Sequence, residues 1–261
     1  AVELPQKTIV LAGVEFMGES AKLLNPDKTV LLPEPTADCP MAHMVSKKTI
    51  EEARAQYGDD LAVVCYVNST AEMKTWSDVC VTSSNAEKIC RELPQKHLLF
   101  IPDVNLGRFI AKQVPEKHVI LNKGYCPRHQ RIVPSEIIAL EEEYPDALVL
   151  AHPECTEEVL AEADYIGSTK GIIEFTQKSD AKDFIIVTMV GVLCEMELRN
   201  AGSGKHFHFA RRVPVCENMT TVTLEKVAHC LANEQVGVQV PAQFQEPAKK
   251  TLELMLEYAA R

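Results

Sequence analysis

The sequence contains no CxxC pair and no apolar run of about 18 residues, the minimum for a membrane-spanning helix. The first absence argues against a zinc ribbon or a thioredoxin-like site, and the second argues against a membrane protein. Basic residues are also few: 27 Lys and Arg stand against 37 Asp and Glu, a formal net charge of −10. A broad nucleic-acid surface needs a basic face, so we expect no nucleic-acid partner. A helix N-terminus can still hold a small anion.

The 261 residues include nine cysteines, an odd number scattered along the chain. The N-terminus as given has no basic start, apolar segment and cleavage site, so we expect no secretory signal. Under these conditions reduced thiols or metal ligands are favoured over a disulfide framework. We therefore expect a cytoplasmic protein.

Two stretches of the chain repeat one pattern, residues 63–89 and residues 148–175. Each reads as an apolar strand, a polar turn, a helix and a second strand, followed by small hydroxyl residues that open another helix. The separation of 12 positions between Tyr66 and Asp78 recurs in the second stretch. The pattern therefore predicts two related structural units.

A second pattern occurs three times, as an apolar strand, a Gly-containing loop, an amphipathic helix and a further strand. Its helix-bearing parts are residues 8–24, 98–113 and 184–199, and the strands that follow lie within 28–35, 117–124 and 207–214. A cysteine follows each time. Cys126 lies 87 residues after Cys39, and Cys216 lies 90 residues after Cys126.

Strands that alternate with helices at this spacing predict parallel sheets covered by helices. We predict an α/β protein of three pseudo-symmetric α/β/α units with short parallel sheets, each closing on a cysteine beyond a strand's carboxyl end, where α/β proteins place ligands. Three such loops are expected to converge on a central site. The predicted domains are 1–38 plus 217–261, 39–126 and 127–216.

The first unit is expected to be incomplete. Only 38 residues precede Cys39, whereas the other two units have close to 90 each before their cysteine, and the chain begins at Ala1 rather than Met. About 50 residues are missing from the first unit by this comparison. A partial chain is one explanation, and a first unit that is naturally shorter is the other.

Three cysteines on three units can hold a cubane iron–sulfur cluster and leave one iron as a Lewis acid. Zinc bound by three sulfurs and one histidine is the rival, less favoured because only Cys126 has a histidine three positions on. The remaining thiols fall in apolar strand or helix patterns and are expected in the core. They are Cys65, Cys80, Cys90, Cys155, Cys194 and Cys230.

Six segments, "AGVEFMGESAKLLNPDKTVLLPEPTADCPMAH", "YVNSTAEMKTWSDVCVTSSNA", "PDVNLGRFIA", "GYCPRHQ", "HPEC…ADYIGST" and "VCENMTTVTLEKV", resemble the quinolinate synthase family. The resemblance runs from about residue 7 to residue 258. It implies the enzyme of bacterial NAD biosynthesis that condenses iminoaspartate with dihydroxyacetone phosphate to quinolinate, losing phosphate and water. It also implies a [4Fe–4S] cluster on Cys39, Cys126 and Cys216, and a functional link to an L-aspartate oxidase or dehydrogenase that supplies iminoaspartate.

His152 and Glu154 stand two residues apart at a strand's end, so both can face one pocket. The resemblance implies that they transfer protons during catalysis and bind substrate; a surface ion pair is the alternative. Tyr66 and Asn68 hold the same place in the preceding unit. The resemblance implies a catalytic and substrate-binding role for Tyr66 and substrate binding for Asn68, against a packed Tyr and a turn Asn.

Ser83, Ser168 and Thr169 open helices after strands, a geometry that attracts phosphate or carboxylate. Plain helix capping is the alternative, and the resemblance favours binding for Ser83 and Thr169. His129 is implied as a substrate contact beside the cluster, against an exposed loop histidine. The "GSGKH" stretch lacks Ser or Thr after its Lys, so we predict a turn there and no nucleotide site.

Family members begin with a strand bearing a His and a Tyr that act on the substrates, and this strand belongs to the half-unit expected to be missing. Because residues that act on the substrates would be missing, a non-enzymatic function is the rival. The chain would then be an inactive remnant, or a metal-binding module that keeps three thiolate ligands.

Overall fold

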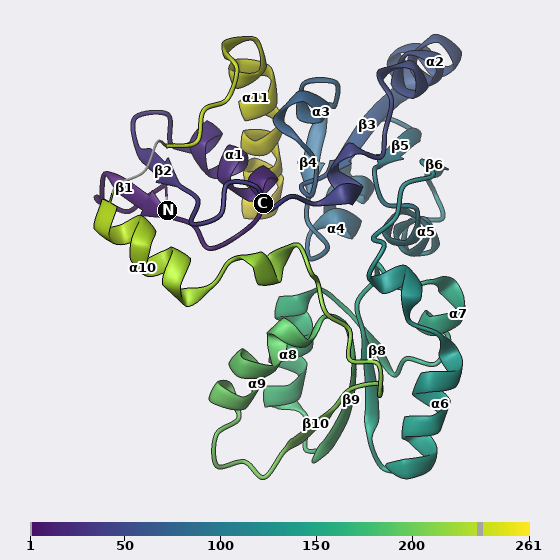
Figure 1. Cartoon of the computed structure of the whole chain (residues 1–261). Helices are drawn as coiled ribbons and strands as arrows, with labels where there is room; N and C mark the ends of the chain where they lie inside the picture. Colours follow the sequence, from purple (N-terminus) through teal and green to yellow (C-terminus); the bar gives the residue numbers. More distant parts are fainter. Residues whose placement is uncertain (1, 234–236) are drawn as a thin grey trace. The chain divides into compact units, whose positions relative to one another are not determined.

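The computed structural model describes residues 2–233 and 237–261. The chain forms two compact units (Figure 1): unit 1 consists of Ala1–Gly124 and Glu217–Arg261, and unit 2 is Tyr125–Cys216. Both are built from parallel strands and helices, so the predicted α/β class is confirmed. Unit 2 lies close to the predicted domain 127–216, and the division of the rest into two domains stays a prediction.

Unit 2 contains one parallel sheet with the strand order β10-β9-β7-β8. The strands are β7 (Leu148–Ala151), β8 (Tyr165–Ile166), β9 (Asp183–Val187) and β10 (His206–His208). The helices are α6 (Pro134–Glu143), α7 (Glu157–Leu160), α8 (Thr169–Lys178) and α9 (Leu193–Arg199), with the short 3₁₀ turns η3 (His129–Arg131) and η4 (Val190–Val192). Before β10, Gly202 and Gly204 adopt φ of 76° and 68°, as the predicted turn requires.

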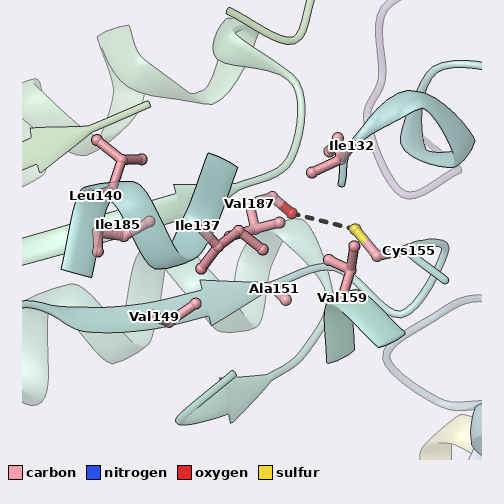
Figure 2. Close-up of a cluster of buried hydrophobic side chains, with 9 residues drawn as sticks. All are labelled: Ile132, Ile137, Leu140, Val149, Ala151, Cys155, Val159, Ile185 and Val187. Atoms are coloured by element: carbon pink, nitrogen blue, oxygen red, sulfur yellow. Dashed lines mark hydrogen bonds between the residues drawn. The ribbon is translucent and has the colours of Figure 1, made fainter. Parts of the chain in front are cut away.

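Side chains of unit 2 alternate between two apolar layers, because successive residues of a strand face opposite sides of a sheet. Figure 2 shows the layer beneath α6 and α7, to which Val149 and Val187 belong. Leu150 and Ile186 face the other way and pack against α8 and α9. Helices therefore cover both faces, as expected for a parallel sheet. The full layer of Figure 2 is Ile132, Ile137, Leu140, Val149, Ala151, Cys155, Val159, Ile185 and Val187.

Unit 1 contains a four-stranded parallel sheet and a two-stranded parallel sheet, ordered β4-β3-β5-β6 and β1-β2. The strands are β1 (Thr8–Val10), β2 (Thr29–Leu31), β3 (Leu61–Tyr66), β4 (Val79–Val81), β5 (His97–Ile101) and β6 (His118–Leu121). The helices are α1 (Glu15–Leu24), α2 (Lys47–Tyr57), α3 (Ala71–Thr75), α4 (Ala86–Glu92), α5 (Val104–Gln113), α10 (Leu224–Asn233) and α11 (Ala242–Ala260), with the 3₁₀ turns η1 (Pro40–His43), η2 (Gly58–Asp60) and η5 (Met219–Thr221). Helix α11 packs against α1 and also against α3 and β4, so it joins the two sheets of this unit.

The predicted repeat is seen both in the strand order of the two four-stranded sheets and in one hydrogen bond that each sheet contains. The order β4-β3-β5-β6 in unit 1 matches β8-β7-β9-β10 in unit 2. Asp78 precedes β4, and its Oδ2 accepts the Val63 N–H at 2.7 Å; Asp164 accepts the Val149 N–H in the same way at 2.8 Å. Each aspartate accepts from a backbone N–H 15 residues before it, so the matching positions of Asp78 and Asp164 in the repeat reflect one shared carboxylate contact.

Two helix glycines hold the same position in the repeat. A methyl group on Gly18 of α1 would lie 2.8 Å from Leu32, and one on Gly107 of α5 would lie 2.9 Å from Leu121. Such distances are too short for a Cβ, so an alanine at either position would require the neighbouring leucine side chain to shift. Helix α9 of unit 2 instead buries Met196 four residues after its N-cap.

Five of the six cysteines expected in the core are buried, namely Cys65, Cys80, Cys90, Cys155 and Cys230. The expectation is wrong for Cys194, which is exposed on α9 because only one side of this short helix, with Met196, packs on the sheet. None of the helices in the described part of the chain is long and apolar enough to cross a bilayer.

Candidate active site

His152 and Glu154 directly follow strand β7 at its carboxyl end, and both are nearly buried, with 4% and 5% of their surface exposed. The Cys155 N–H donates to the His152 carbonyl at 3.0 Å, and Cys155 itself lies in the apolar layer of Figure 2. This tight turn fixes both side chains at the edge of the sheet. The surface ion pair considered from the sequence is therefore wrong, because neither side chain is at the surface.

His129 joins three segments of unit 2. Its Nδ1 lies 3.0 Å from Glu154 Oε2 and 3.2 Å from Cys126 Sγ, and its Nε2 lies 3.0 Å from Thr188 Oγ1. Because Nδ1 faces a carboxylate, it carries a proton and donates a hydrogen bond to Glu154, while Nε2 lies at hydrogen-bond distance from the Thr188 hydroxyl. Only 5% of His129 is exposed, so the alternative of an exposed loop histidine is wrong.

His152 stacks on His129, with ring centroids 5.1 Å apart and an angle of 25° between the planes. Burial lowers the pKa of His152 to about 4; the negative charge of Glu154 opposes this shift, and the neighbouring His129 adds to it. His152 is therefore neutral near pH 7. Its Nδ1 accepts the Glu154 backbone N–H at 3.3 Å, so its proton lies on Nε2.

Cys126 completes the group. Burial raises the pKa of its thiol, and the negative charge of Glu154 raises it further, so the thiol is protonated unless a cation displaces the proton. Ligand atoms of Cys126, His129 and Glu154 lie within 4.8 Å of one another and could hold a metal ion. This is the metal-ligating group that the structure offers in unit 2.

The three cysteines predicted as cluster ligands also fit that role by their chemistry. Cys39, Cys126 and Cys216 form no disulfide and are of intermediate exposure, whereas five of the other six are buried. They follow β2, β6 and β10, the last strand of each sheet repeat. Cys39 belongs to unit 1, and Cys126 and Cys216 belong to unit 2.

The remaining predicted residues of unit 2 lie at the start of α8. Ser168 is the N-cap, and its Oγ accepts the Gly171 N–H at 3.1 Å. Thr169 is the first helical residue and is exposed. Capping thus accounts for one interaction of the Ser168 hydroxyl, and the binding role of both residues stays a prediction.

In unit 1, Tyr66 ends β3 and is 5% exposed, and Asn68 follows two residues later. They hold the positions that His152 and Glu154 hold after β7. Ser83 lies in the turn between β4 and α4, where Asn85 is the N-cap, so Ser83 does not cap this helix. The binding roles of these unit 1 residues also stay predictions.

Thr188 is the site residue that the sequence did not indicate. It directly follows β9, is 3% exposed and contacts His129 Nε2. Its position in the sequence was the available signal: Thr188 directly follows β9 just as His152 directly follows β7, and the two parallel strands are neighbours. A threonine after a strand is too common to be selected on that ground alone.

Comparisons with known proteins agree on one family. The family model described as quinolinate synthetase A protein matches residues 1–257. The quinolinate synthase of Fusobacterium nucleatum is 49% identical over 259 residues, which cover 99% of this chain and 85% of that protein. That of Caldicellulosiruptor bescii is 46% identical over 255 residues, with 98% and 83% covered. That of Alkaliphilus metalliredigens is 44% identical over 249 residues, with 95% and 81% covered.

Proposed function

Because this chain belongs to the quinolinate synthase family of enzymes, we propose that it condenses iminoaspartate with dihydroxyacetone phosphate to quinolinate, losing phosphate and two waters. The observation that carries the proposal is the buried group of Glu154, His129 and His152 at the carboxyl edge of the unit 2 sheet. A carboxylate and two imidazoles have little reason to share a buried site unless they handle protons or a metal.

Glu154 and His152 carry the proton transfers in this proposal. Glu154 is held by His129 Nδ1 at 3.0 Å, which keeps the carboxylate in place as a base. His152 is neutral with its proton on Nε2, which donates a hydrogen bond to the departing hydroxyl, and Glu154 returns to that hydroxyl the proton it removed from the substrate, so that water leaves. Enolisation and dehydration need one group that removes a proton and one that supplies it, and the pair meets both needs.

Substrate anions are held by the loops that follow the strands. We assign Tyr66 and Asn68 to the substrate carboxylate, with Tyr66 also close to the reacting atoms. We assign phosphate or carboxylate to the hydroxyls and backbone N–H groups of Ser168 and Thr169 at the start of α8, and to those of Ser83 in the turn before α4. We also assign a substrate contact to His129, next to the Glu154 carboxylate that its Nδ1 holds.

A [4Fe–4S] cluster held by Cys39, Cys126 and Cys216 is the cofactor in this proposal, supported by the intermediate exposure of these three cysteines, none of which is in a disulfide. When bound, its iron without a protein ligand supplies a Lewis acid for a substrate hydroxyl. A single metal ion on Cys126, His129 and Glu154 is the second candidate, favoured by the short distances within that group. Iron and sulfide analysis separates the two.

Iminoaspartate hydrolyses readily in water, so an L-aspartate oxidase or dehydrogenase acting nearby is the expected supplier. A cytoplasmic location is part of the same proposal, because it keeps the nine cysteines, none of which is in a disulfide, reduced. No nucleic acid or membrane enters the proposed reaction.

The test compares Glu154→Gln with Glu142→Gln, an exposed carboxylate on α6, after anaerobic loading with iron and sulfide. Iminoaspartate is generated in place, dihydroxyacetone phosphate is added, and quinolinate is measured by chromatography. We expect Glu154→Gln to lower kcat by about 100-fold or more, with Glu142→Gln unchanged. Equal rates for the two variants would contradict the assigned role, and a cluster-loaded chain without product would favour the metal-binding module.

A further inference from the structure

Three arginines of unit 2 differ in their contacts from Arg54, Arg91 and Arg199. Arg54, Arg91 and Arg199 each pair with a carboxylate at 2.6–3.1 Å. Arg131, Arg211 and Arg212 are exposed, and none of them forms an ion pair with residues 2–233 or 237–261. In a chain with 37 acidic residues and a net charge of −10, unpaired guanidinium groups are unexpected.

The three arginines lie in the two loops that carry the unit 2 cysteines. Arg131 ends η3, five residues after Cys126, and Arg211 and Arg212 precede Cys216 by five and four residues. We call residues 126–131 and 211–216 the arginine loops. Neither loop contains an Asp or Glu, so the positive charge is not neutralised within either loop.

Both arginine loops contact the same short segment after β9. His129 Nε2 lies 3.0 Å from Thr188 Oγ1, and the Val190 N–H donates to the Pro214 carbonyl at 2.8 Å. Strands β7, β9 and β10 are parallel, so their carboxyl ends share one edge of the sheet. The arginine loops therefore border the edge at which His152 and Glu154 lie.

We propose that Arg131, Arg211 and Arg212 attract the dianionic substrates to the candidate active site and guide their entry. This inference rests on the proposed function, in which both substrates carry two negative charges. The overall charge of −10 repels such ligands at long range, and a local cluster of guanidinium groups reverses the potential at the entrance. Guanidinium groups also bind carboxylate and phosphate in a bidentate manner.

The experiment is the double charge reversal Arg211→Glu with Arg212→Glu in the full, cluster-loaded chain. The matched control is Arg199→Glu, an arginine of the same unit that pairs with Glu195. Steady-state rates are measured at an ionic strength of about 25 mM and again at about 400 mM, where screening is strong. A neutral double variant, Arg211→Gln with Arg212→Gln, gives an intermediate charge.

We expect the reversal to lower kcat/KM by about 10-fold or more at low ionic strength and by under about threefold at high ionic strength. The value of kcat stays within about twofold, because the arginines do not touch the reacting atoms, and the Gln variant falls between. Rates equal to those of Arg199→Glu, or a loss that salt does not change, would overturn the proposal.

A second measurement separates this inference from the proposed function. Pyridine-2,3-dicarboxylate is titrated calorimetrically into the metal-free chain and the same variants. Weaker binding in the reversal variant, with binding by Arg199→Glu unchanged, supports the arginine loops even if no quinolinate is formed. The inference is overturned if the reversal variant binds as tightly as the unsubstituted chain, or if the unsubstituted chain does not bind at all. An unsubstituted enzyme that forms no quinolinate contradicts the proposed function instead.

Discussion

Replacing Thr188 with valine tests the hydrogen-bond network that holds His129. Valine has nearly the shape of threonine but no hydroxyl, so the substitution leaves His129 Nε2 without the partner that lies 3.0 Å away. Both side chains are at least 95% buried, so water does not readily replace the lost bond. Leaving a buried polar atom unsatisfied costs about 1–3 kcal/mol.

We expect Thr188→Val to lower the free energy of unfolding of the metal-free chain by about 1–2 kcal/mol. The loss is measured from the shift of the urea midpoint followed by circular dichroism. Thr188→Ser keeps the hydroxyl and is the matched control; it loses only a methyl group, about 1 kcal/mol or less. A released His129 also reorients Glu154, so the activity of the loaded enzyme should fall in Thr188→Val more than in Thr188→Ser.

Two outcomes would refute this reasoning. If Thr188→Val unfolds at the same urea concentration as the unsubstituted chain, the hydroxyl does not stabilise His129. If Thr188→Ser is as damaging as Thr188→Val, the effect comes from packing and not from the hydrogen bond.

Three further predictions concern pH, packing and iron. The pKa of His152 is lowered to about 4 in the folded chain and is about 6.5 in the unfolded chain. The stability that the neutral ring contributes is therefore present above pH 6.5 and is lost as the pH falls towards 4. Urea titrations of the metal-free chain should show a loss of about 3 kcal/mol over this range, and His152→Phe should reduce that loss. Gly107→Ala, whose methyl group would lie 2.9 Å from a leucine of β6, should destabilise by about 1–2 kcal/mol, whereas Gly191→Ala, with no atom within 4 Å, should be tolerated; equal melting temperatures would contradict this. After loading with iron and sulfide, the Cys216→Ser variant should bind far less iron than the about four atoms expected per chain. The Cys194→Ser variant, changed at an exposed cysteine, should bind the full amount. Equal iron content in the two variants would exclude Cys216 as a ligand.

Much of the fold could be predicted from the sequence because it repeats. Buried parallel strands appear as short apolar runs, and the 12-residue spacing to Asp78 and Asp164 marks the carboxylate that holds each second strand. The loop that carries His152 and Glu154 could also be predicted, because it directly follows the apolar run that forms β7. These features depend on neighbours in sequence, which is why they could be predicted.

Other features depend on contacts between distant segments. The burial of His129 is set by Glu154 and Thr188, 25 and 59 residues further on, and nothing near His129 in the sequence indicates either partner. Cys194 was expected in the core from the apolar character of its segment, but α9 has seven residues and buries only one side with Met196. Ser168 and Thr169 are adjacent in sequence, and only the folded backbone identifies Ser168 as the cap.

Product formation by the unsubstituted chain is the most direct test of the account. The chain is loaded anaerobically with iron and sulfide, supplied with iminoaspartate and with dihydroxyacetone phosphate labelled at all three carbons, and the products are analysed by mass spectrometry. The account predicts quinolinate that carries three labelled carbons, formed only when both substrates are present. A chain that takes up its iron and sulfide and still forms no labelled quinolinate would contradict it.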